Sequence, residues 1–416
     1  MLDNSTERVT QLIFFIISIL YLFNAVINDY RRFLTKKYII EYLIILFAVA
    51  SICLSKVINF VSIRALLMLV INFIALTIDD LHDRDYFKTI EQIVFLIMLI
   101  SVIHNVLCLV LCATDILKIT NFQIYHDKRL YGFTYVNGTG EIALLGIGSI
   151  IFFLEKINYN RKNKFFCFYV FAIFLNALVL VLTQNRISMY GLPLCLFIYL
   201  ILKIHKEKTT FDAVKIIKSV LLMAFIIFII FVLLVKFNIF YLRKFSIISN
   251  ERVDIWIAYL LVFIRENIIL GLGPGKALQI YRERLGSNPV QNYIDYFGDK
   301  SIANWLCSFY NYFESFMPHN EYLRHMVMFG IVGIALIFVY IFNVLRKLYK
   351  IYRYGNSKHV MICYLSVFYL IFPLISGCVE NTFSFTNSPR YFVTFMFFFM
   401  VGYVYKMYNA IEEKRG

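Results

Sequence analysis

The chain has 416 residues, of which 61% are hydrophobic, 18% aromatic and 16% charged, and its formal net charge is +15 at pH 7. Soluble globular domains have roughly 45–50% apolar and about 25% charged residues, so this composition excludes a soluble enzyme and a disordered chain. It predicts a membrane protein whose positive charge reflects loop topology rather than a nucleic-acid partner.

Long apolar stretches predict about eleven membrane-crossing helices, because a bilayer core about 30 Å thick needs about 20 helical residues. The stretches lie near residues 11–27, 38–54, 58–78, 90–113, 139–154, 165–182, 187–204, 216–237, 321–345, 360–379 and 391–408. The fifth is short, which leaves open a partial, re-entrant crossing. We expect an all-α polytopic transmembrane helix bundle of about eleven spans, within a range of about ten to twelve, with one large external loop.

Lysine and arginine gather in alternate loops, and such loops stay on the cytoplasmic side of a membrane. The basic loops lie near residues 31–37, 156–164, 203–218 and 346–358. This pattern predicts an external N-terminus and a cytoplasmic C-terminus. It divides the chain into residues 1–237 with the first spans, an external loop at 238–320, and residues 321–416 with the last spans.

The external loop at 238–320 holds both tryptophans of the chain, Trp256 and Trp305, and its acidic and basic residues nearly balance. Aromatic rings suit sugar binding, and an interfacial aromatic belt explains the same rings equally well. The apolar run at 255–264 is too short to cross a bilayer. We expect it to form a helix in the membrane interface that holds Arg252 at the level of a lipid-linked phosphate.

A glycine-rich segment follows, in which Gly271, Gly273 and Gly275 precede Lys276. The Gly-x4-Gly-Lys-Ser/Thr spacing of a nucleotide-binding loop is absent, so nucleotide binding is not predicted. Two interpretations stay open: a turn whose backbone N–H groups face an anionic head group, and a plain turn.

His319 ends the external loop in the sequence Pro318-His319-Asn320, directly before an apolar stretch. A histidine at such a junction can act as a general base near neutral pH, because its unperturbed pKa is about 6.5. For a histidine considered alone, a structural role is the more common one. His325 lies about two turns further along the expected helix, where it would support the same mouth of the bundle.

Three arginines are expected at the external face: Arg129, Arg186 and Arg252. Their planar guanidinium groups match phosphate oxygens, which favours a diphosphate clamp, whereas snorkelling to lipid head groups is the alternative. Glu380 and Arg390 lie at the same mouth, between the last two spans. Either of them would orient an acceptor, or the two would form an ion pair with each other.

The stretch His319-Asn320, nine residues, Gly330, two residues and Gly333 resembles the H-[NSQ]-x9-G-x2-[GTY] pattern of the O-antigen ligase/polymerase superfamily. This superfamily includes lipopolysaccharide O-antigen ligases, Wzy-type O-antigen and capsule polymerases, and O-linked oligosaccharyltransferases. Supporting matches are Arg129-x-x-Gly132-Phe133, Thr183-x-x-Arg186, Arg252-x3-Trp256 and Gly271-x-Gly273-x-Gly275. Asn185 departs from the pattern, because many members have serine there.

The resemblance implies an inverting, metal-independent glycosyl transfer that needs no cofactor. The reaction would take place on the periplasmic, external face of a bacterial cytoplasmic (inner) membrane, with a glycan on undecaprenyl diphosphate as donor. His319 would accept the proton of the acceptor hydroxyl, and Arg129, Arg186 and Arg252 would hold the diphosphate. Residues expected to bind the acceptor or support the site are Asn320, His325, Glu380, Arg390, Trp256 and Trp305. The expected partners are the lipid bilayer, a flippase and a chain-length regulator, and no nucleic acid.

Within the superfamily we favour a polymerase that joins lipid-linked repeat units into O-antigen or capsular polysaccharide. An O-antigen ligase that transfers the glycan to lipid A core is the alternative. A lipid-linked oligosaccharide flippase or polysaccharide exporter is the alternative of another class. A transporter predicts ionisable residues inside several spans and internal repeats, and neither is evident in the sequence.

Overall fold

The computed structural model describes residues 38–58, 60–74, 86–116, 125–126, 129–133, 135–158, 162–207, 252–264, 267–280, 318–380 and 391–413, with single residues between 291 and 304. Two expected spans, 11–27 and 216–237, lie outside these residues. Every other expected span corresponds to helix in the described ranges, and the all-α prediction is confirmed.

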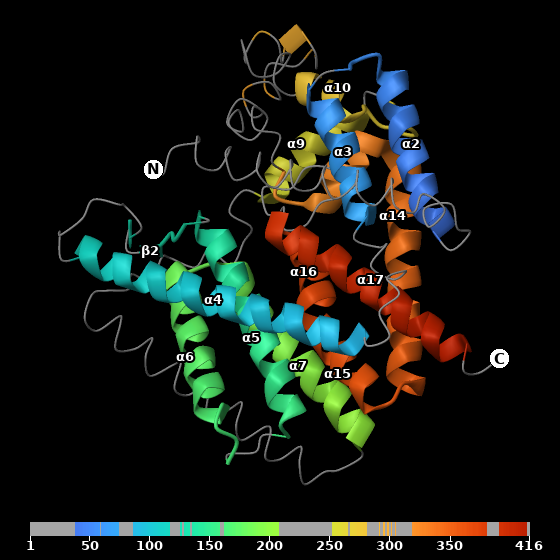
Figure 1. Ribbon diagram of the computed structural model, residues 1–416. Helices are drawn as coiled ribbons and strands as arrows, with labels where there is room; N and C mark the ends of the chain where they lie inside the picture. Colours follow the sequence, from blue (N-terminus) through green and yellow to red (C-terminus); the bar gives the residue numbers. More distant parts are fainter. Residues whose placement is uncertain are drawn as a thin grey trace.

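The described helices form one bundle in which α14 is the longest element (Figure 1). The helices are α2 (Ile39–Ser55), α3 (Phe60–Ile74), α4 (Tyr86–Ile116), α5 (Tyr135–Lys156), α6 (Phe166–Thr183), α7 (Arg186–Glu207), α9 (Arg252–Ile264), α10 (Pro274–Gln279), α14 (Glu321–Tyr354), α15 (Ser357–Ser366), the π-helical turn η5 (Val367–Ile371), α16 (Phe372–Ser376) and α17 (Tyr391–Glu413). The β structure of this part is one antiparallel pair, β1 (Tyr125–His126) and β2 (Arg129–Leu130).

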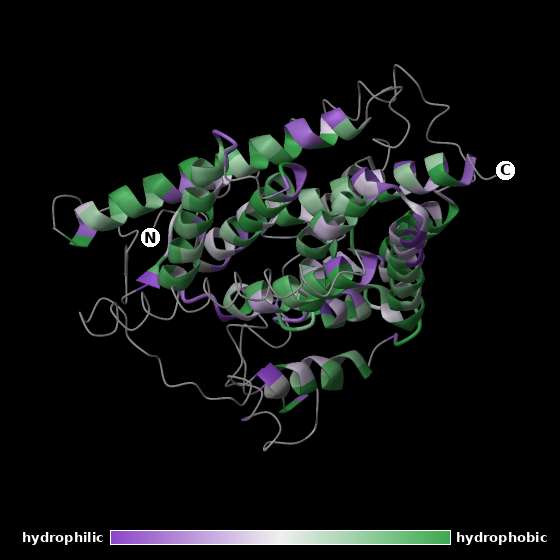
Figure 2. Ribbon diagram, turned by 90° about the horizontal axis from the view of Figure 1, so that it is seen from below, coloured by the Kyte–Doolittle hydropathy of each residue, from purple (hydrophilic) through white to green (hydrophobic). Residues whose placement is uncertain are grey.

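Six helices of the described part are long and apolar enough to cross a membrane: α4, α5, α6, α7, α14, and the continuous helix formed by α15, η5 and α16. Hydrophobic residues cover most of each long helix (Figure 2). The short fifth stretch of the sequence becomes a helix of 22 residues, which is long enough to cross completely. The chain is therefore a multi-pass membrane protein.

Helix α5 lies at the centre of the packing because its glycines let neighbouring helices approach closely. A Cβ at Gly146 would lie 2.3 Å from the Ser101 hydroxyl of α4 and 2.6 Å from the Asn176 side chain of α6. A Cβ at Gly148 would lie 2.6 Å from the Phe368 side chain of η5. Small residues at these positions thus bring three elements against one helix.

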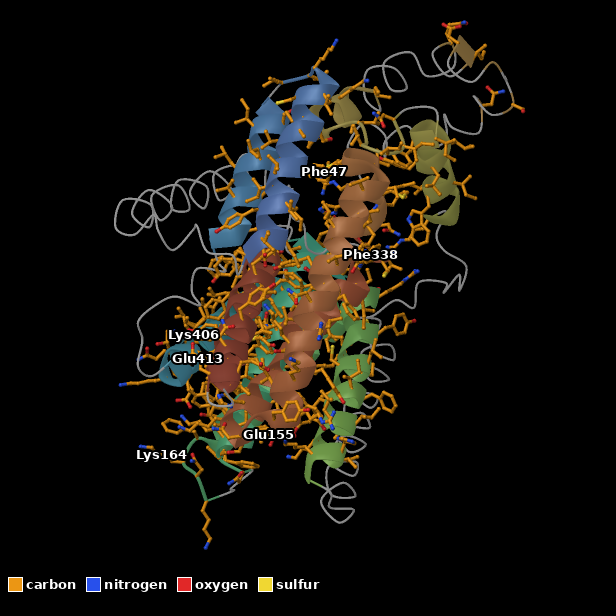
Figure 3. All side chains as sticks on the ribbon, turned by 90° about the vertical axis from the view of Figure 1, so that its right-hand side faces the viewer. Phe47, Glu155, Lys164, Phe338, Lys406 and Glu413 are labelled. Atoms are coloured by element: carbon orange, nitrogen blue, oxygen red, sulfur yellow. The ribbon has the colours of Figure 1, made fainter. Side chains whose placement is uncertain are left out.

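Ion pairs mark one end of the bundle, which we call the basic end and define by Glu91, Glu155, Lys156 and Lys203. Lys156 Nζ lies 2.6 Å from a Glu91 oxygen, and Lys203 Nζ lies 2.7 Å from a Glu155 oxygen. Glu155 and Lys164 both lie toward this end in Figure 3. The lysines that meet there come from loops that the sequence predicts on one side of the membrane, so the helix directions agree with that pattern.

Helix α14 is interrupted at Gly330, whose φ of +69° and ψ of −172° are not helical. In an unbroken helix, the N–H groups of residues 331 and 332 would donate to the carbonyls of residues 327 and 328. The segment that follows α9 supplies other partners. The four backbone hydrogen bonds are Leu272 N to Val327 O at 3.0 Å, Gly273 N to Met328 O at 2.8 Å, Ile331 N to Ile268 O at 2.9 Å, and Val332 N to Ile269 O at 3.3 Å.

We call residues 268–273 and 327–332, with these four hydrogen bonds, the Gly271–Gly330 interlock. Inside a bilayer, backbone groups without partners are costly, so a broken helix needs such replacements. The two glycines also touch. A Cβ on Gly271 would lie 2.3 Å from Gly330 N, and a Cβ on Gly330 would lie 2.2 Å from Ile269 O.

Replacing Lys203 by methionine should destabilise the protein strongly. Lys203 and Glu155 keep only 8% and 9% of their side-chain surface exposed. Removing one partner of a buried pair leaves an uncompensated charge and costs about 3–5 kcal/mol. Lys156→Met is the control, because the Lys156 side chain is 45% exposed and surface pairs contribute about 1 kcal/mol or less. Thermal unfolding in detergent should show a clear drop in Tm for Lys203→Met only; equal Tm values would contradict the buried pair.

Candidate active site

Helix α14 begins directly after Pro318-His319-Asn320 and so places the predicted general base at its N-terminus. The side chain of Asn320 caps the helix by accepting a hydrogen bond from a backbone N–H in the first turn at 2.9 Å. The N–H of Glu321 donates to the carbonyl of Gly377 at 2.8 Å. His319 has a φ of +51°. Such a conformation costs a non-glycine residue about 1–3 kcal/mol and needs surrounding contacts to hold it.

The carboxylate of Glu380 joins Arg252 to His319. Its Oε1 lies 2.6 Å from Arg252 Nη2, and its Oε2 lies 3.1 Å from His319 Nδ1. Arg252 also donates through Nη1 to the carbonyl of Val379 at 2.6 Å. We call these three side chains the Arg252–Glu380–His319 cluster. It unites residues from α9, from the loop end before α14, and from the segment after α16.

Exposure in the cluster differs between its members in a way that suits catalysis. The Glu380 side chain keeps 7% of its surface exposed, whereas Arg252 keeps 25% and His319 keeps 28%. An ionised carboxylate only accepts hydrogen bonds, so beside Glu380 the Nδ1 atom of His319 must carry the proton. The lone pair of His319 is then on Nε2, where a general base needs it. The buried carboxylate therefore fixes the tautomer of the more exposed imidazole.

Helix α9 holds Arg252 at its first turn and is anchored to the start of α14. Trp256 Nε1 donates to the carbonyl of Pro318 at 2.9 Å. Ile255, Ala258 and Tyr259 are fully buried on one side of α9. The expected helix in the external loop is thus present, with 13 residues. Its position in a membrane interface stays a prediction.

Arg129 and Arg186 both lie at a second turn, between α6 and α7. Strand β2 carries Arg129, whose Nε lies 3.3 Å from the carbonyl of Thr183 and whose Nη2 lies 3.5 Å from that of Gln184. Gln184 ends α6 with a φ of +51°, and Arg186 is the first residue of α7. Of the three arginines that the sequence predicts to act as one clamp, Arg129 and Arg186 are therefore placed around one turn, whereas Arg252 contacts Glu380.

Asn185, where many superfamily members have serine, caps the start of α7. Its Oδ1 accepts a hydrogen bond from the N–H of Ile187 at 3.2 Å. Its Nδ2 donates to the carbonyl of Asn137 on α5 at 3.1 Å. Asparagine and serine are both strong N-cap residues, so the departure from the pattern keeps the turn intact.

The packing of α7 against the helix formed by α15, η5 and α16 relates this turn to the cluster. A Cβ at Gly191 would lie 2.3 Å from the Phe372 ring, and the Tyr199 and Tyr364 rings lie 5.3 Å apart. Going from Gly191 to Tyr199 toward the C-terminus of α7 therefore matches going from Phe372 to Tyr364 toward the N-terminus of its neighbour. The two helices are antiparallel, and residues that lie side by side follow this register. Continued to the start of α7, this register puts Arg186 level with Gly377, three residues before Glu380.

The hydrogen bonds and ion pairs that join Arg252, Glu380 and His319 do not include three other predicted residues, His325, Trp305 and Arg390. His325 is 2% exposed, and its Nδ1 lies 2.7 Å from the carbonyl of Glu321 in its own helix, so its role in the site stays a prediction. Trp305 and Arg390 lie outside the described residues. The ion pair between Glu380 and Arg390 therefore remains an expectation from the sequence, beside the observed pairing of Glu380 with Arg252.

The first backbone N–H groups of the glycine-rich segment already have acceptors within the protein. The N–H of Gly271 donates to Asn267 O at 2.8 Å, and those of Leu272 and Gly273 donate to α14 carbonyls. These three N–H groups are therefore not available to a head-group nest, and the nest interpretation stays a prediction for Gly275 and Lys276. The physical reason is that the break in α14 leaves carbonyls that need these same donors.

Sequence reasoning missed two buried polar residues, one at the Gly271–Gly330 interlock and one close to the turn that carries Arg186. Ser51 of α2 places its hydroxyl 3.1 Å from Leu270 O and 3.3 Å from Met328 O, so it braces both sides of the interlock. Glu141 of α5 is fully buried next to Gly140, whose Cβ position lies 3.0 Å from the Asn185 side chain. A carboxylate within an apolar stretch is the signal that would have revealed Glu141.

Metal ligands do not gather in the part of the chain that the structure describes. No group of three or more His, Cys, Asp or Glu side chains there could hold a metal ion. The metal-independent reaction stays a prediction.

Comparison with protein families supports the resemblance found in the sequence. Residues 171–338 match the family model described as O-antigen ligase. This segment includes Arg186, Arg252, His319 and both halves of the interlock, whereas Arg129 and Glu380 lie outside it. No curated protein matches the chain. Members of the matched family are membrane glycosyltransferase-like enzymes that act as ligases or polymerases. Over residues 171–338 the chain is similar to the O-antigen ligase family, and this match supports the O-antigen ligase/polymerase superfamily.

Proposed function

We propose that the protein polymerises undecaprenyl-diphosphate-linked oligosaccharide repeat units on the external face of the bacterial cytoplasmic membrane. The Arg252–Glu380–His319 cluster carries this proposal, because it joins a general base to a cationic group through one buried carboxylate. The matched family supports glycosyl transfer in general. The donor, the acceptor and the face of the membrane belong to the proposal.

His319 Nε2 accepts the proton of an acceptor hydroxyl on another lipid-linked repeat unit. The hydroxyl oxygen forms a bond to the anomeric carbon of the donor sugar as the bond from that carbon to the diphosphate oxygen breaks. The bonding electrons leave with undecaprenyl diphosphate, and the configuration at the anomeric carbon is inverted. Glu380 stabilises the imidazolium that forms, as the aspartate does in a catalytic triad.

The arginines hold the donor diphosphate and stabilise its growing negative charge. A guanidinium has five N–H donors, and Arg252 uses two of them in its contacts with Glu380 and Val379. The remaining donors and the 25% exposed surface of Arg252 suit a phosphate. Arg186, which lies level with Gly377, reaches the same diphosphate from α7. Arg129 fixes the turn that carries Arg186.

An O-antigen ligase is the second candidate, and the description of the matched family favours it. The donor chemistry is the same in both reactions, so only the acceptor distinguishes them. Purified protein should be given the lipid-linked repeat unit alone and, separately, together with a lipid A core acceptor. Longer chains from the repeat unit alone support the polymerase, whereas products that form only with lipid A core show a ligase. No transfer under either condition would overturn the proposed function.

Replacing His319 by alanine should remove chain elongation, because the acceptor hydroxyl loses its base. General bases typically contribute about 10²–10⁴-fold to a rate. The matched control is His205→Ala, since His205 lies on α7 near the basic end and contacts the Tyr352 hydroxyl at 2.9 Å. Gel ladders of the polysaccharide measure both variants. A wild-type ladder from His319→Ala would refute the role of this base.

Glu380→Gln should lower kcat while the protein remains folded. The amide keeps the shape and one acceptor but loses the charge that stabilises the imidazolium and fixes its tautomer. Amide replacement of the equivalent triad carboxylate lowers kcat about 10⁴-fold, and we expect a loss in that direction here. Single-turnover rates with bound donor measure the effect, and an unchanged rate would show that Glu380 does not act on His319.

Arg252→Lys and Arg186→Lys should weaken donor use, because lysine keeps the charge but loses the planar fork that binds phosphate. KM for the lipid-linked donor should rise and kcat should fall in both variants. Arg353→Lys is the control, since Arg353 is exposed and its guanidinium lies 5.3 Å from the Tyr354 ring at the far end of α14. Steady-state kinetics that match the control would contradict the clamp.

A further inference from the structure

Helices α9 and α14 are joined at two levels. Near the site, Trp256 bonds the carbonyl of Pro318, and Glu380 links Arg252 to His319. At the other end of α9, the chain passes Ile264 and reaches the Gly271–Gly330 interlock within a few residues. The segment that carries Arg252 and the one that follows His319 are thus held together by contacts at both ends.

The interlock fixes the spacing of these helices through backbone atoms alone. Its four hydrogen bonds run antiparallel between residues 268–273 and 327–332. A shift by one residue would leave N–H and carbonyl groups of the broken helix without partners, which is costly inside a membrane. The close contact of Gly271 with Gly330 leaves no room for a side chain on either. Only one register and one separation therefore satisfy the interlock.

Helix α2 supports the interlock from outside. The Ser51 hydroxyl lies within hydrogen-bond distance of Leu270 O on one side and Met328 O on the other. A Cβ at Gly273 would lie 2.9 Å from the Ser55 side chain, so α2 packs directly against the glycine segment. Ser51 is 3% exposed and contacts neither Arg252 nor His319 in any hydrogen bond that the described residues show.

We propose that the Gly271–Gly330 interlock is a positioning element for the transfer reaction, with Gly271, Gly330 and Ser51 as positioning residues. It holds α9 against α14 so that the Arg252 guanidinium and His319 Nε2 address the diphosphate and the acceptor hydroxyl of one bound donor–acceptor pair. This inference rests on the proposed function. Because a misplacement of about 1 Å can cost on the order of 10²-fold in rate, loosening the interlock lowers kcat without removing any catalytic group.

The test compares Gly330→Ala with Gly298→Ala. Both glycines have nearly the same positive φ, +69° and +70°, but a Cβ at Gly298 meets nothing within 4 Å. Both variants therefore carry a side chain at a positive φ, and Gly330→Ala alone also presses a Cβ against the interlock. We expect kcat per folded molecule to fall on the order of 10²-fold in Gly330→Ala and to stay near wild type in Gly298→Ala.

A second readout follows the helix itself. The chain has two tryptophans, so 5-fluorotryptophan labelling gives two ¹⁹F signals, and Trp305→Phe serves only to assign them. Loosening the interlock should shift or broaden the Trp256 signal, since Trp256 holds α9 to Pro318. A purely structural role of Gly330 would lower the yield of folded protein and leave kcat and the Trp256 signal of the folded fraction unchanged. That outcome would overturn the proposal.

If Gly330→Ala does not fold, Ser51→Ala takes its place, because it removes a brace without adding atoms. Ser366→Ala is its control, since Ser366 is also buried but donates only to Ile362 O within its own helix, at 2.8 Å. We expect lower kcat and an altered Trp256 signal in Ser51→Ala alone, and wild-type values for both would overturn the proposal. Absence of transfer by the wild-type protein would instead count against the proposed function, while the ¹⁹F signals still test the interlock.

Discussion

The site depends on one carboxylate that two cationic or basic groups share. Glu380 is nearly buried, and its two oxygens contact Arg252 and His319. An isolated buried carboxylate would be very costly, so its placement requires these partners, and they in turn are held by it. Because Arg252, His319 and Glu380 come from three separate segments, this single group brings α9, the start of α14 and the end of α16 to one point.

A second constraint acts at the Gly271–Gly330 interlock, because the membrane environment demands a partner for every backbone polar group. The break of α14 at Gly330 removes two helical hydrogen bonds, and the glycine-rich segment after α9 replaces them. The glycines of two separate motifs thus serve one contact. This explains why Leu272 and Gly273, in a segment that superficially resembles a phosphate-binding loop, donate their N–H groups to carbonyls of α14.

The sequence was sufficient to predict the helices from apolar length, and its local motifs named the individual residues of the candidate site. His319 at the loop end and Arg252 before an apolar run were recognisable from their neighbours in the chain. The partner of Glu380 was not recognisable in this way, because Arg252 lies 128 residues away in the chain and Arg390 is a cation much nearer in the sequence. Backbone hydrogen bonds leave no side-chain signature, and so the interlock between residues 268–273 and 327–332 could only be seen in the structure.

The stereochemistry of the new glycosidic bond tests the central claim most directly. A synthetic undecaprenyl-diphosphate repeat unit of defined anomeric configuration is given to the purified protein, and NMR determines the configuration of the linkage formed. Direct attack by a hydroxyl deprotonated at His319, with the diphosphate held by arginine, predicts complete inversion. Retention would require a covalent glycosyl intermediate and would contradict the role proposed for the Arg252–Glu380–His319 cluster.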